Sequence, residues 1–211
     1  MASIASIGLA HHERGTHCGV YFLNASSRIA FLHFSAQSKL NSDDGDNYYI
    51  EIKCPLPEAE KKAISNLCRY IVKKNAATGL RYCMNKTDSF TPKGNLVLNK
   101  DGSGFTCGSF VKTVFKDAGY PILDEASWPR ASAADLKWAK DLTDVFKEHI
   151  PGERNQAHYE AIDPACPCSR FKPEEVAASL EVAPPPAQYS AIQTRVSELL
   201  IEVQTSRPSM P

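Results

Sequence analysis

The stretch Gly102-Ser103-Gly104-Phe105-Thr106-Cys107-Gly108-Ser109-Phe110-Val111 joins a glycine-rich turn to the start of an amphipathic helix. Thr106 is a helix-capping residue type and the apolar residues after it recur at helical spacing, so a helix is predicted to begin at Cys107. Gly119 and Pro121 are expected to end it. A cysteine in the first turn lies at the positive end of the helix dipole, which favours its thiolate. Cys107 is therefore the leading candidate for a nucleophile; the alternative is a small cysteine packed at a helix start.

Length and composition limit the number of domains, the partners and the location that this chain can have. The chain has 211 residues, and we expect one catalytic domain over residues 1–182, then a proline-rich linker, an amphipathic helix and a tail over residues 183–211. The 24 basic and 24 acidic side chains balance, so composition gives no electrostatic argument for nucleic acid as a partner. No run of about 18 apolar residues occurs, so no membrane span is expected. The odd number of cysteines, seven, favours a reducing, cytoplasmic location, with export by a specialised secretion system as the alternative.

Two runs of strand-forming residues, Thr16–Leu23 and Arg28–Phe34, predict a β-hairpin closed by Asn24–Ser27, with the N-terminal segment ahead of it. Side chains alternate along a strand, so each strand presents its histidine, His17 or His33, on one face. A three-residue loop would place the two histidines opposite each other, whereas a four-residue loop would place them on opposite faces of the sheet. The sequence leaves both registers open.

The other elements follow from hydrophobic spacing and from helix start and stop signals. The expected segments are a polar surface loop (36–47), a third strand (48–53), a core-facing helix that starts at 57–58, a short extended segment (79–84), a long excursion (85–103), a helix capped by Ser132 and Asp135, a loop-like region (153–171), a short helix (173–180), a stiff linker (183–187) and a last amphipathic helix (189–204). That last helix is expected either to dock back onto the core or to bind a protein partner.

His17, His33 and Cys107 together supply what a cysteine hydrolase needs. One histidine takes the thiol proton and returns it to the leaving group, and a second polar group fixes the tautomer of that histidine. Cys166-Pro167-Cys168, even with His158, lacks the paired ligand spacing of a structural zinc site, so no metal is predicted. No phosphate-cradling or dinucleotide-binding glycine motif occurs, so no cofactor is expected.

These residues carry a resemblance to a known family. His-x-Gly-Val-Tyr on one strand, a histidine late in the next strand and Thr-Cys-Gly-Ser-Phe-Val opening a helix resemble the circularly permuted branch of the NlpC-type papain-like superfamily, which includes the lecithin:retinol acyltransferase-like enzymes. The resemblance covers roughly Thr16 to Gly119, as a dispersed pattern with one strong local motif. It implies an α+β, permuted papain-like domain, in which an antiparallel sheet packs on the helix that carries the catalytic cysteine. The chain differs from the acyltransferase-like enzymes in lacking their Asn-Cys-Glu-His context.

The resemblance also implies roles for single residues. Carried over by position, Cys107 is the nucleophile, His17 the general base and His33 the residue that orients His17. Tyr21, Thr106 and Gly108 are expected to contact the substrate.

The expected function is that of a thiol hydrolase that cleaves an amide bond, in a peptide or protein substrate, through a thioacyl-enzyme intermediate. The same residues would serve an acyltransferase or lipase, or a glutamine deamidase. A third hypothesis is a non-catalytic papain-like binding module, in which Cys107 is a packed residue and the helix over residues 189–204 recruits a protein partner.

Overall fold

The computed structural model describes residues 4–12, 15–36, 39–43, 49–84, 87–99, 102–150, 152–162, 168–182 and 184–206. It is an α+β structure built on a five-stranded antiparallel sheet in the order β4-β3-β2-β1-β5, with a separate two-stranded ladder. The strands are β1 (Ala5–His12), β2 (Gly15–Leu23), β3 (Ile29–Ala36), β4 (Lys39–Asp43), β5 (Ile50–Lys53), β6 (Ser89–Phe90) and β7 (Leu96–Val97). The helices are α1 (Glu58–Asn75), α2 (Cys107–Asp117), α3 (Ala133–His149), α4 (Glu153–Glu160), α5 (Pro173–Glu181) and α6 (Gln193–Thr205), with 3-10 turns η1 (Glu125–Ser127) and η2 (Tyr189–Ile192).

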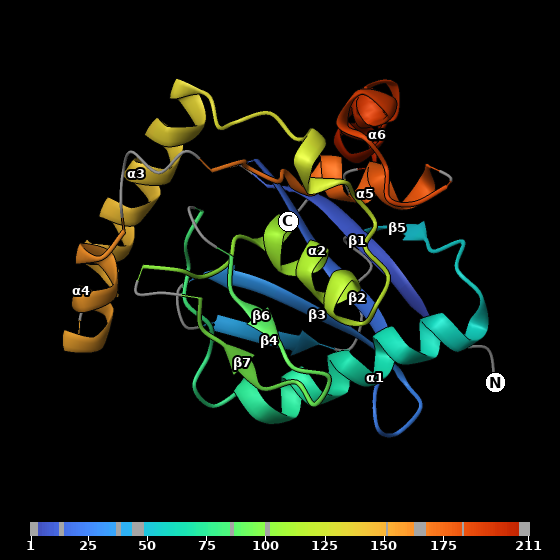
Figure 1. Cartoon of the computed structure of the whole chain (residues 1–211), viewed down its shortest axis with the longest axis horizontal. Helices are drawn as coiled ribbons and strands as arrows, with labels where there is room; N and C mark the ends of the chain where they lie inside the picture. The colour runs from blue at the N-terminus through green and yellow to red at the C-terminus, as the bar shows by residue number, and fades with distance from the viewer. Residues whose placement is uncertain are drawn as a thin grey trace.

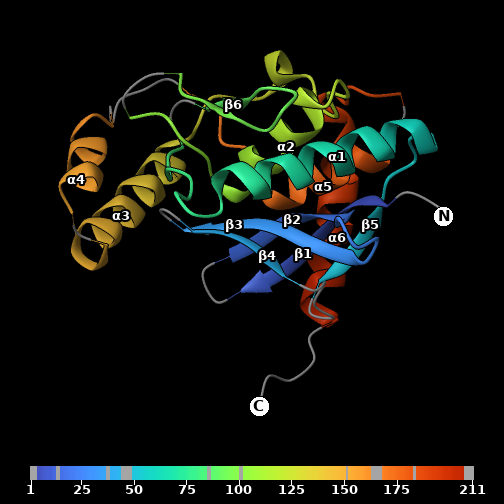
Figure 2. The same cartoon turned by 90° about the horizontal axis from the view of Figure 1, so that it is seen from below.

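The helices cover the sheet on one side. In Figure 2 helices α1, α2 and α5 lie above the sheet, while α3 and α4 stand beside it, at the left of Figures 1 and 2. The apolar side chains of β2 that face this helical layer, Cys18, Val20 and Phe22, are fully buried. Helix α2 packs on β2 and β3 and therefore occupies the centre of the layer.

Two strands of the five-stranded sheet were not expected from the sequence. The N-terminal segment, placed ahead of the first strand, forms β1 between β2 and β5, and the expected surface loop contains β4 at the sheet edge. Gly8 and Ala10 on β1 leave room on its second face instead of supplying strand-forming side chains, so the alternating pattern is weak. The polar residues of β4 suit an edge strand, which is also why they read as a loop. The third expected strand is β5, over Ile50–Lys53, and residue 48 lies outside the described residues.

The register between β2 and β3 differs from both expected hairpins. Leu23 pairs with Ile29, so the connection comprises residues 24–28, and the last pair of this ladder is Gly19 with His33. Because side-chain direction alternates, His17 and His33 lie on the same face, in diagonal rather than directly opposite positions. Beyond this pair β3 continues along β4, while β2 continues along β1. The two strands therefore part at the end of the sheet that carries the histidines.

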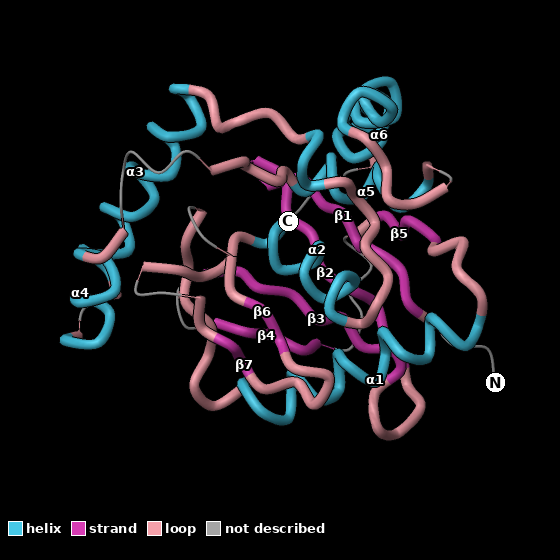
Figure 3. Tube along the Cα trace, in the orientation of Figure 1, coloured by secondary structure: helices cyan, strands magenta, loops and turns pink. Residues whose placement is uncertain are grey.

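The predicted helices form where local signals are strong. Helix α1 buries the stripe Ile64, Leu67, Cys68 and Ile71, and α3 begins with the Ser132 and Asp135 capping box. Proline opens α5 at Pro173 as expected. The region expected to be loop-like after residue 153 contains α4, a short polar helix with little apolar periodicity to signal it. The excursion before α2 is mostly loop, interrupted by β6 and β7 (Figure 3).

The C-terminal helix docks back onto the core. Ile192, Leu199 and Val203 are buried, and α6 packs against α5 and β1 (upper right in Figure 1). The end of the proline-rich segment expected to be a stiff linker is also bound to the domain. The Ala187 amide donates a hydrogen bond to the Ile122 carbonyl at 3.0 Å, and the Asp124 amide donates one to the Ala187 carbonyl at 2.9 Å. The apolar stripe thus has an intramolecular partner. None of the helices in the described ranges is both long enough and apolar enough to cross a membrane.

Candidate active site

Helix α2 places Cys107 at its first position. The Thr106 hydroxyl accepts a hydrogen bond from the Ser109 amide at 3.2 Å, and the Ser109 hydroxyl accepts one from the Thr106 amide at 2.8 Å. This capping box fixes the first turn, because it satisfies amides that have no partner within the helix. Cys107 is partly buried as a whole residue, whereas Thr106 and Gly108 on either side of it are buried. The helix therefore presents this one side chain at its mouth.

A pair of histidines lies on the opposite face of the sheet from the helical layer. The Nε2 atom of His17 lies 2.9 Å from Nδ1 of His33, and the two rings meet edge to face. His33 is buried and stacks on Phe31, with ring centroids 5.2 Å apart. Because burial and stacking hold the His33 ring in one position, His33 is well suited to orient the imidazole of His17.

Two glycines make room for this arrangement. A Cβ atom on Gly19 would lie 2.6 Å from the Phe31 ring and 2.7 Å from the Cβ of His33. On Gly8 it would lie 2.6 Å from the same ring. Phe31 can therefore lie flat against the strand backbones only because β1 and β2 lack side chains here, and it supports His33 in turn.

Cys107 interacts with one histidine of this pair, His17. A hydrogen bond from the Cys18 thiol, a hydrogen bond from His17, the charge of His17 and the Cys18 amide hold the pKa of Cys107 well below its ordinary value, although burial opposes this. Since Nε2 of His17 faces His33, Nδ1 is the ring nitrogen that remains for the thiol. Cys107 thus interacts with His17, and His17 in turn contacts His33.

The parting of β2 and β3 explains how one sulfur reaches both His17 and Cys18. These residues are neighbours on β2, so their side chains point to opposite faces of the sheet. In the described residues, pairing between β2 and β3 ends at Gly19, and α2 packs on both strands. From this edge a thiolate can contact the side chains of both faces as well as the backbone amide between them.

Sequence reasoning missed two residues of this site, Cys18 and Tyr82. Cys18 is fully buried on the helical face of β2, where a small cysteine is an ordinary core residue. Tyr82 comes close to Cys107 because its segment pairs with the segment that precedes α2. The Cys83 amide donates a hydrogen bond at 3.0 Å to the carbonyl of Phe105, which lies two residues before Cys107. Burial and then the charge of Cys107 raise the pKa of Tyr82, so its hydroxyl stays protonated near the thiolate. No local pattern signals this long-range pairing.

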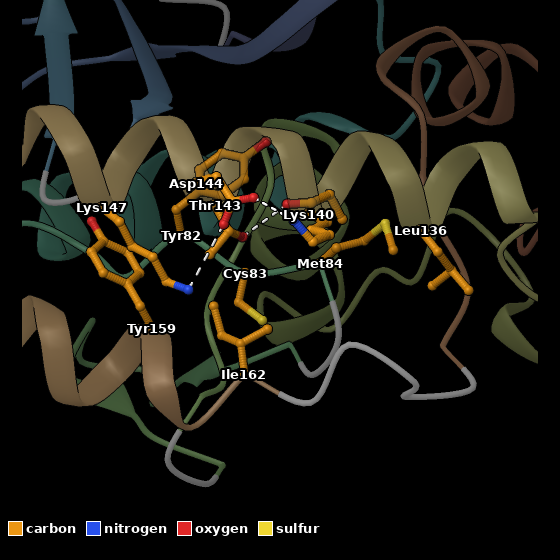
Figure 4. A pocket seen from close by; sticks show the side chains of 11 residues that line it. Tyr82, Cys83, Met84, Leu136, Lys140, Thr143, Asp144, Lys147, Tyr159 and Ile162 are labelled. Carbon is orange, nitrogen blue, oxygen red and sulfur yellow. Dashed lines mark hydrogen bonds and ion pairs between the residues drawn. The ribbon is translucent and has the colours of Figure 1, made fainter.

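A cavity of about 180 Å³ adjoins Tyr82 on the side of α3 and α4 (Figure 4). Its charged side chains lie along α3, where Lys140 and Lys147 pair with Asp144 at 2.6 and 3.8 Å. The remainder of the lining is mostly apolar. The lining residues are Tyr82, Cys83, Met84, Leu136, Ala139, Lys140, Thr143, Asp144, Lys147, Tyr159 and Ile162.

The residues expected to contact the substrate have packing positions in the structure. Thr106 is buried as the helix cap, and the ring of Tyr21 is buried against Phe31 at 4.7 Å between centroids. Gly108 is required by close approach, because a Cβ atom there would lie 2.1 Å from the Phe171 carbonyl oxygen. Each of the three residues therefore packs within the protein, and its contact with a substrate stays a prediction.

Of the second cysteine group, Cys168 is the described member. Cys166 lies outside the described residues, and Cys168 lines a separate polar cavity together with Lys112. His158 instead contacts the Tyr82 carbonyl oxygen through Nε2, at 2.9 Å, and so ties α4 to the Tyr82 segment. Among the described residues, no group of three or more histidine, cysteine or acidic side chains is arranged to hold a metal ion.

No protein-family model matches the chain, and neither the curated proteins nor the solved structures include a match to it.

Proposed function

We propose that this protein is a cysteine hydrolase that cleaves an amide bond, in a circularly permuted papain-like domain of the NlpC type. The observation that carries the proposal is the connected set Cys107, His17 and His33, in which a thiol at a helix N-terminus has a depressed pKa. Catalytic nucleophiles require such a shift, because the thiolate and not the thiol attacks. A cysteine that only packs in a core has its pKa raised by burial, as Cys68 does.

In the proposed reaction the Cys107 thiolate attacks the carbonyl carbon while His17 holds the proton taken from the thiol. The negative charge that develops on the carbonyl oxygen is stabilised by backbone amides at the start of α2. His17 then donates its proton to the leaving amine, and the thioacyl-enzyme forms. A water molecule, deprotonated by the same imidazole, releases the acid.

His33 acts on His17 rather than on the substrate. Its contact with Nε2 fixes the orientation of the His17 ring and directs Nδ1 toward the sulfur. Tyr82 lies close enough to Cys107 for the charge of the thiolate to raise the pKa of the tyrosine hydroxyl. The cavity beside Tyr82 is where an apolar side chain of a peptide substrate would be accommodated.

A thiol-directed electrophile tests the proposal directly. We expect a chloroacetamide probe to label the wild-type chain at Cys107 faster than it labels free cysteine at pH 7, because a larger fraction of the sulfur is thiolate. Cys107→Ala should abolish this labelling, whereas Cys68→Ala, a matched change of a buried cysteine, should leave it intact. Incubation with a peptide library, read by mass spectrometry, then identifies a cleaved bond.

Labelling at the rate of free cysteine, or equal labelling of the two variants, would contradict the proposal and support a binding module. Cleavage products also separate the reactions open to the same residues. New amino and carboxyl termini indicate amide hydrolysis, whereas conversion of glutamine to glutamate or transfer of an acyl group to an acceptor would replace it.

A further inference from the structure

The cavity beside Tyr82 is built between helices α3 and α4 and the segment that carries Tyr82. The Tyr82 ring packs edge to face on Phe146 of α3, with centroids 4.9 Å apart, and stacks on Phe34 of β3 at 5.6 Å. His158 of α4 contacts the Tyr82 carbonyl oxygen at 2.9 Å. Because these contacts hold the walls in place, the cavity is a preformed feature of the fold.

The interior of this cavity suits an aromatic ring. Its lining includes the rings of Tyr82 and Tyr159 and the sulfur-containing side chains of Cys83 and Met84 (Figure 4). Sulfur atoms make favourable contacts with the edges of aromatic rings. The cavity has a volume of about 180 Å³. An apolar cavity of about 150 Å³ is enough to bind benzene, so a single six-membered ring fits here by size as well as by chemistry.

The charged side chains of the cavity lie on α3. Among the described lining residues, Lys140, Asp144 and Lys147 carry charge, and both lysines pair with the one carboxylate, at 2.6 and 3.8 Å (Figure 4). All three side chains are exposed to solvent, which places them at the mouth of the cavity. Two ammonium groups and one carboxylate leave an excess of one positive charge at this mouth, and that excess favours an anionic ligand group.

A buried hydroxyl adds a hydrogen-bond donor to the same cavity. Tyr159 of α4 is 3% exposed, and its hydroxyl makes no hydrogen bond to another described residue. Burial raises the pKa of Tyr159, so the hydroxyl stays protonated. A buried donor without an acceptor lowers stability, and an oxygen atom of a bound ligand removes that penalty.

We propose that this cavity is the binding site of an aromatic carboxylate, with the ring in the interior and the carboxylate at the mouth. The ring contacts Tyr82 and Tyr159, and the carboxylate interacts with Lys140 and Lys147. The volume, the aromatic and sulfur-containing walls and the excess of positive charge on α3 together favour this class of ligand.

Two kinds of molecule carry this chemistry: a free aromatic acid, and a peptide whose last residue is aromatic. The second kind rests on the proposed function, because a hydrolase that holds the last residue of its substrate cleaves near the carboxyl end of a chain. The segment of Tyr82 leads from the cavity toward the nucleophile, since the Cys83 amide pairs with the carbonyl of Phe105, two residues before Cys107.

Small ligands separate the contribution of the ring from that of the carboxylate. Phenylpropionate, N-acetyl-L-phenylalanine, N-acetyl-L-phenylalaninamide and N-acetyl-L-alanine are each titrated into the full-length chain, and binding is followed by NMR. The two aromatic acids should bind about tenfold more tightly than the amide, which lacks the charge, and than acetylalanine, which lacks the ring. Added salt should weaken binding of the acids and leave binding of the amide unchanged.

Changes on α3 test the charges, with a matched control on the same helix. Lys140→Met and Lys147→Met should each weaken binding of N-acetyl-L-phenylalanine by about two- to fivefold. Asp144→Asn should strengthen it, because the carboxylate that competes with the ligand for both lysines is gone, and a gain in affinity cannot come from a damaged fold. Lys137 lies outside the cavity lining and pairs with Asp141 at 2.6 Å, so Lys137→Met should leave the affinity unchanged.

Two further changes test the interior. Ala139→Leu enlarges a lining side chain of α3 and should abolish binding of all three ligands that carry a ring. Tyr159→Phe keeps the ring and removes the hydroxyl, so it should weaken binding of the two acids. An unchanged affinity in Tyr159→Phe would overturn the assignment of that hydroxyl as a donor to the carboxylate.

Equal affinity for the acid and its amide, or equal losses in Lys140→Met and Lys137→Met, would overturn the proposed binding site. Tighter binding of N-acetyl-L-phenylalanine than of phenylpropionate assigns the site to a peptide end, and the reverse order assigns it to a free acid. Chloroacetamide labelling of Cys107 keeps this site apart from the proposed function. Fast labelling without binding of either acid overturns the binding site alone, whereas binding with slow labelling overturns the hydrolase alone.

Discussion

The two faces of the central sheet differ in what they hold. The face under the helices is built from close-packed apolar side chains such as Val20, Phe22 and Leu32, which exclude water and supply stability. The opposite face carries the aromatic rings of Tyr21 and Phe31 with the two histidines, laid over glycines. One strand, β2, therefore contributes to the core and to the candidate site with alternate residues, and Cys107 interacts with Cys18 and His17 of that strand.

Of the changes to the two faces of β2, removing His17 should cause the largest loss of activity. His17→Ala takes away the proposed base, so turnover of a cleaved peptide should fall by about 10²- to 10⁴-fold, with the fold intact because His17 is only partly buried. The pKa of Cys107 should also rise, since His17 contributes a hydrogen bond and a charge that lower it. When the rate of chloroacetamide labelling is plotted against pH, the midpoint of the profile should therefore shift to higher pH.

Phe22→Leu is the control on the helical face. It removes core volume from the same strand and should lower the free energy of unfolding by about 1 kcal/mol. The midpoint of its labelling profile should stay at the wild-type pH. If both variants shift the profile equally, the two faces of β2 are not distinct in function.

His33→Ala should cost less activity than His17→Ala, because it removes orientation and not proton transfer. We expect a loss of about 10- to 100-fold in kcat, with a smaller change in KM. His33→Gln keeps a polar side chain that can face Nε2 of His17 and should recover part of that loss. Equal losses in the alanine and glutamine variants would make His33 a packing residue.

Gly19→Ala and Gly8→Ala test two kinds of steric clash. The added Cβ meets the backbone and Cβ of a neighbouring strand at Gly19, and aromatic side chains at Gly8. A Cβ on Gly19 would meet the Leu32 carbonyl oxygen and the Cβ of His33, each at 2.7 Å, neither of which can rotate away. On Gly8 the close atoms belong to the Phe31 and Tyr21 rings. We expect Gly19→Ala to lower the free energy of unfolding by about 1–3 kcal/mol, measured in urea, and to slow Cys107 labelling. Gly8→Ala should cost less stability and leave labelling faster than in Gly19→Ala.

The parts of the fold that sequence predicted are those with local causes. Capping boxes, an initial proline and the stripe on α1 each act within a few residues, so α1, α2, α3 and α5 begin close to where they were expected. β1, β4 and α4 were missed because their sequences carry small or polar residues. β1 and β4 form by pairing with the strands that adjoin them in the chain, β2 and β3, and that pairing leaves no mark in their residue types.

The candidate site divides in the same way. Cys107 could be identified from its own helix, and His17 and His33 from their strands, but their contact depends on a hairpin register that neither expected loop length gave. Cys18 and Tyr82 had no local signal at all. They join the site only because β2 parts from β3 and because Tyr82 pairs with Phe105 across a long loop.

The smallest predicted effect compares the two capping boxes. Thr106→Ala and Ser132→Ala each remove a hydroxyl that accepts a backbone hydrogen bond at 3.2 Å, so each should lower the free energy of unfolding by about 1 kcal/mol. Only the first cap holds the turn that carries Cys107. Thr106→Ala should therefore also slow chloroacetamide labelling, by a few fold, while Ser132→Ala should not, because Ser132 caps α3 and not the helix that begins at Cys107. Equal labelling rates in the two variants would show that the position of the sulfur does not depend on the cap, and that the contacts from β2 hold it by themselves.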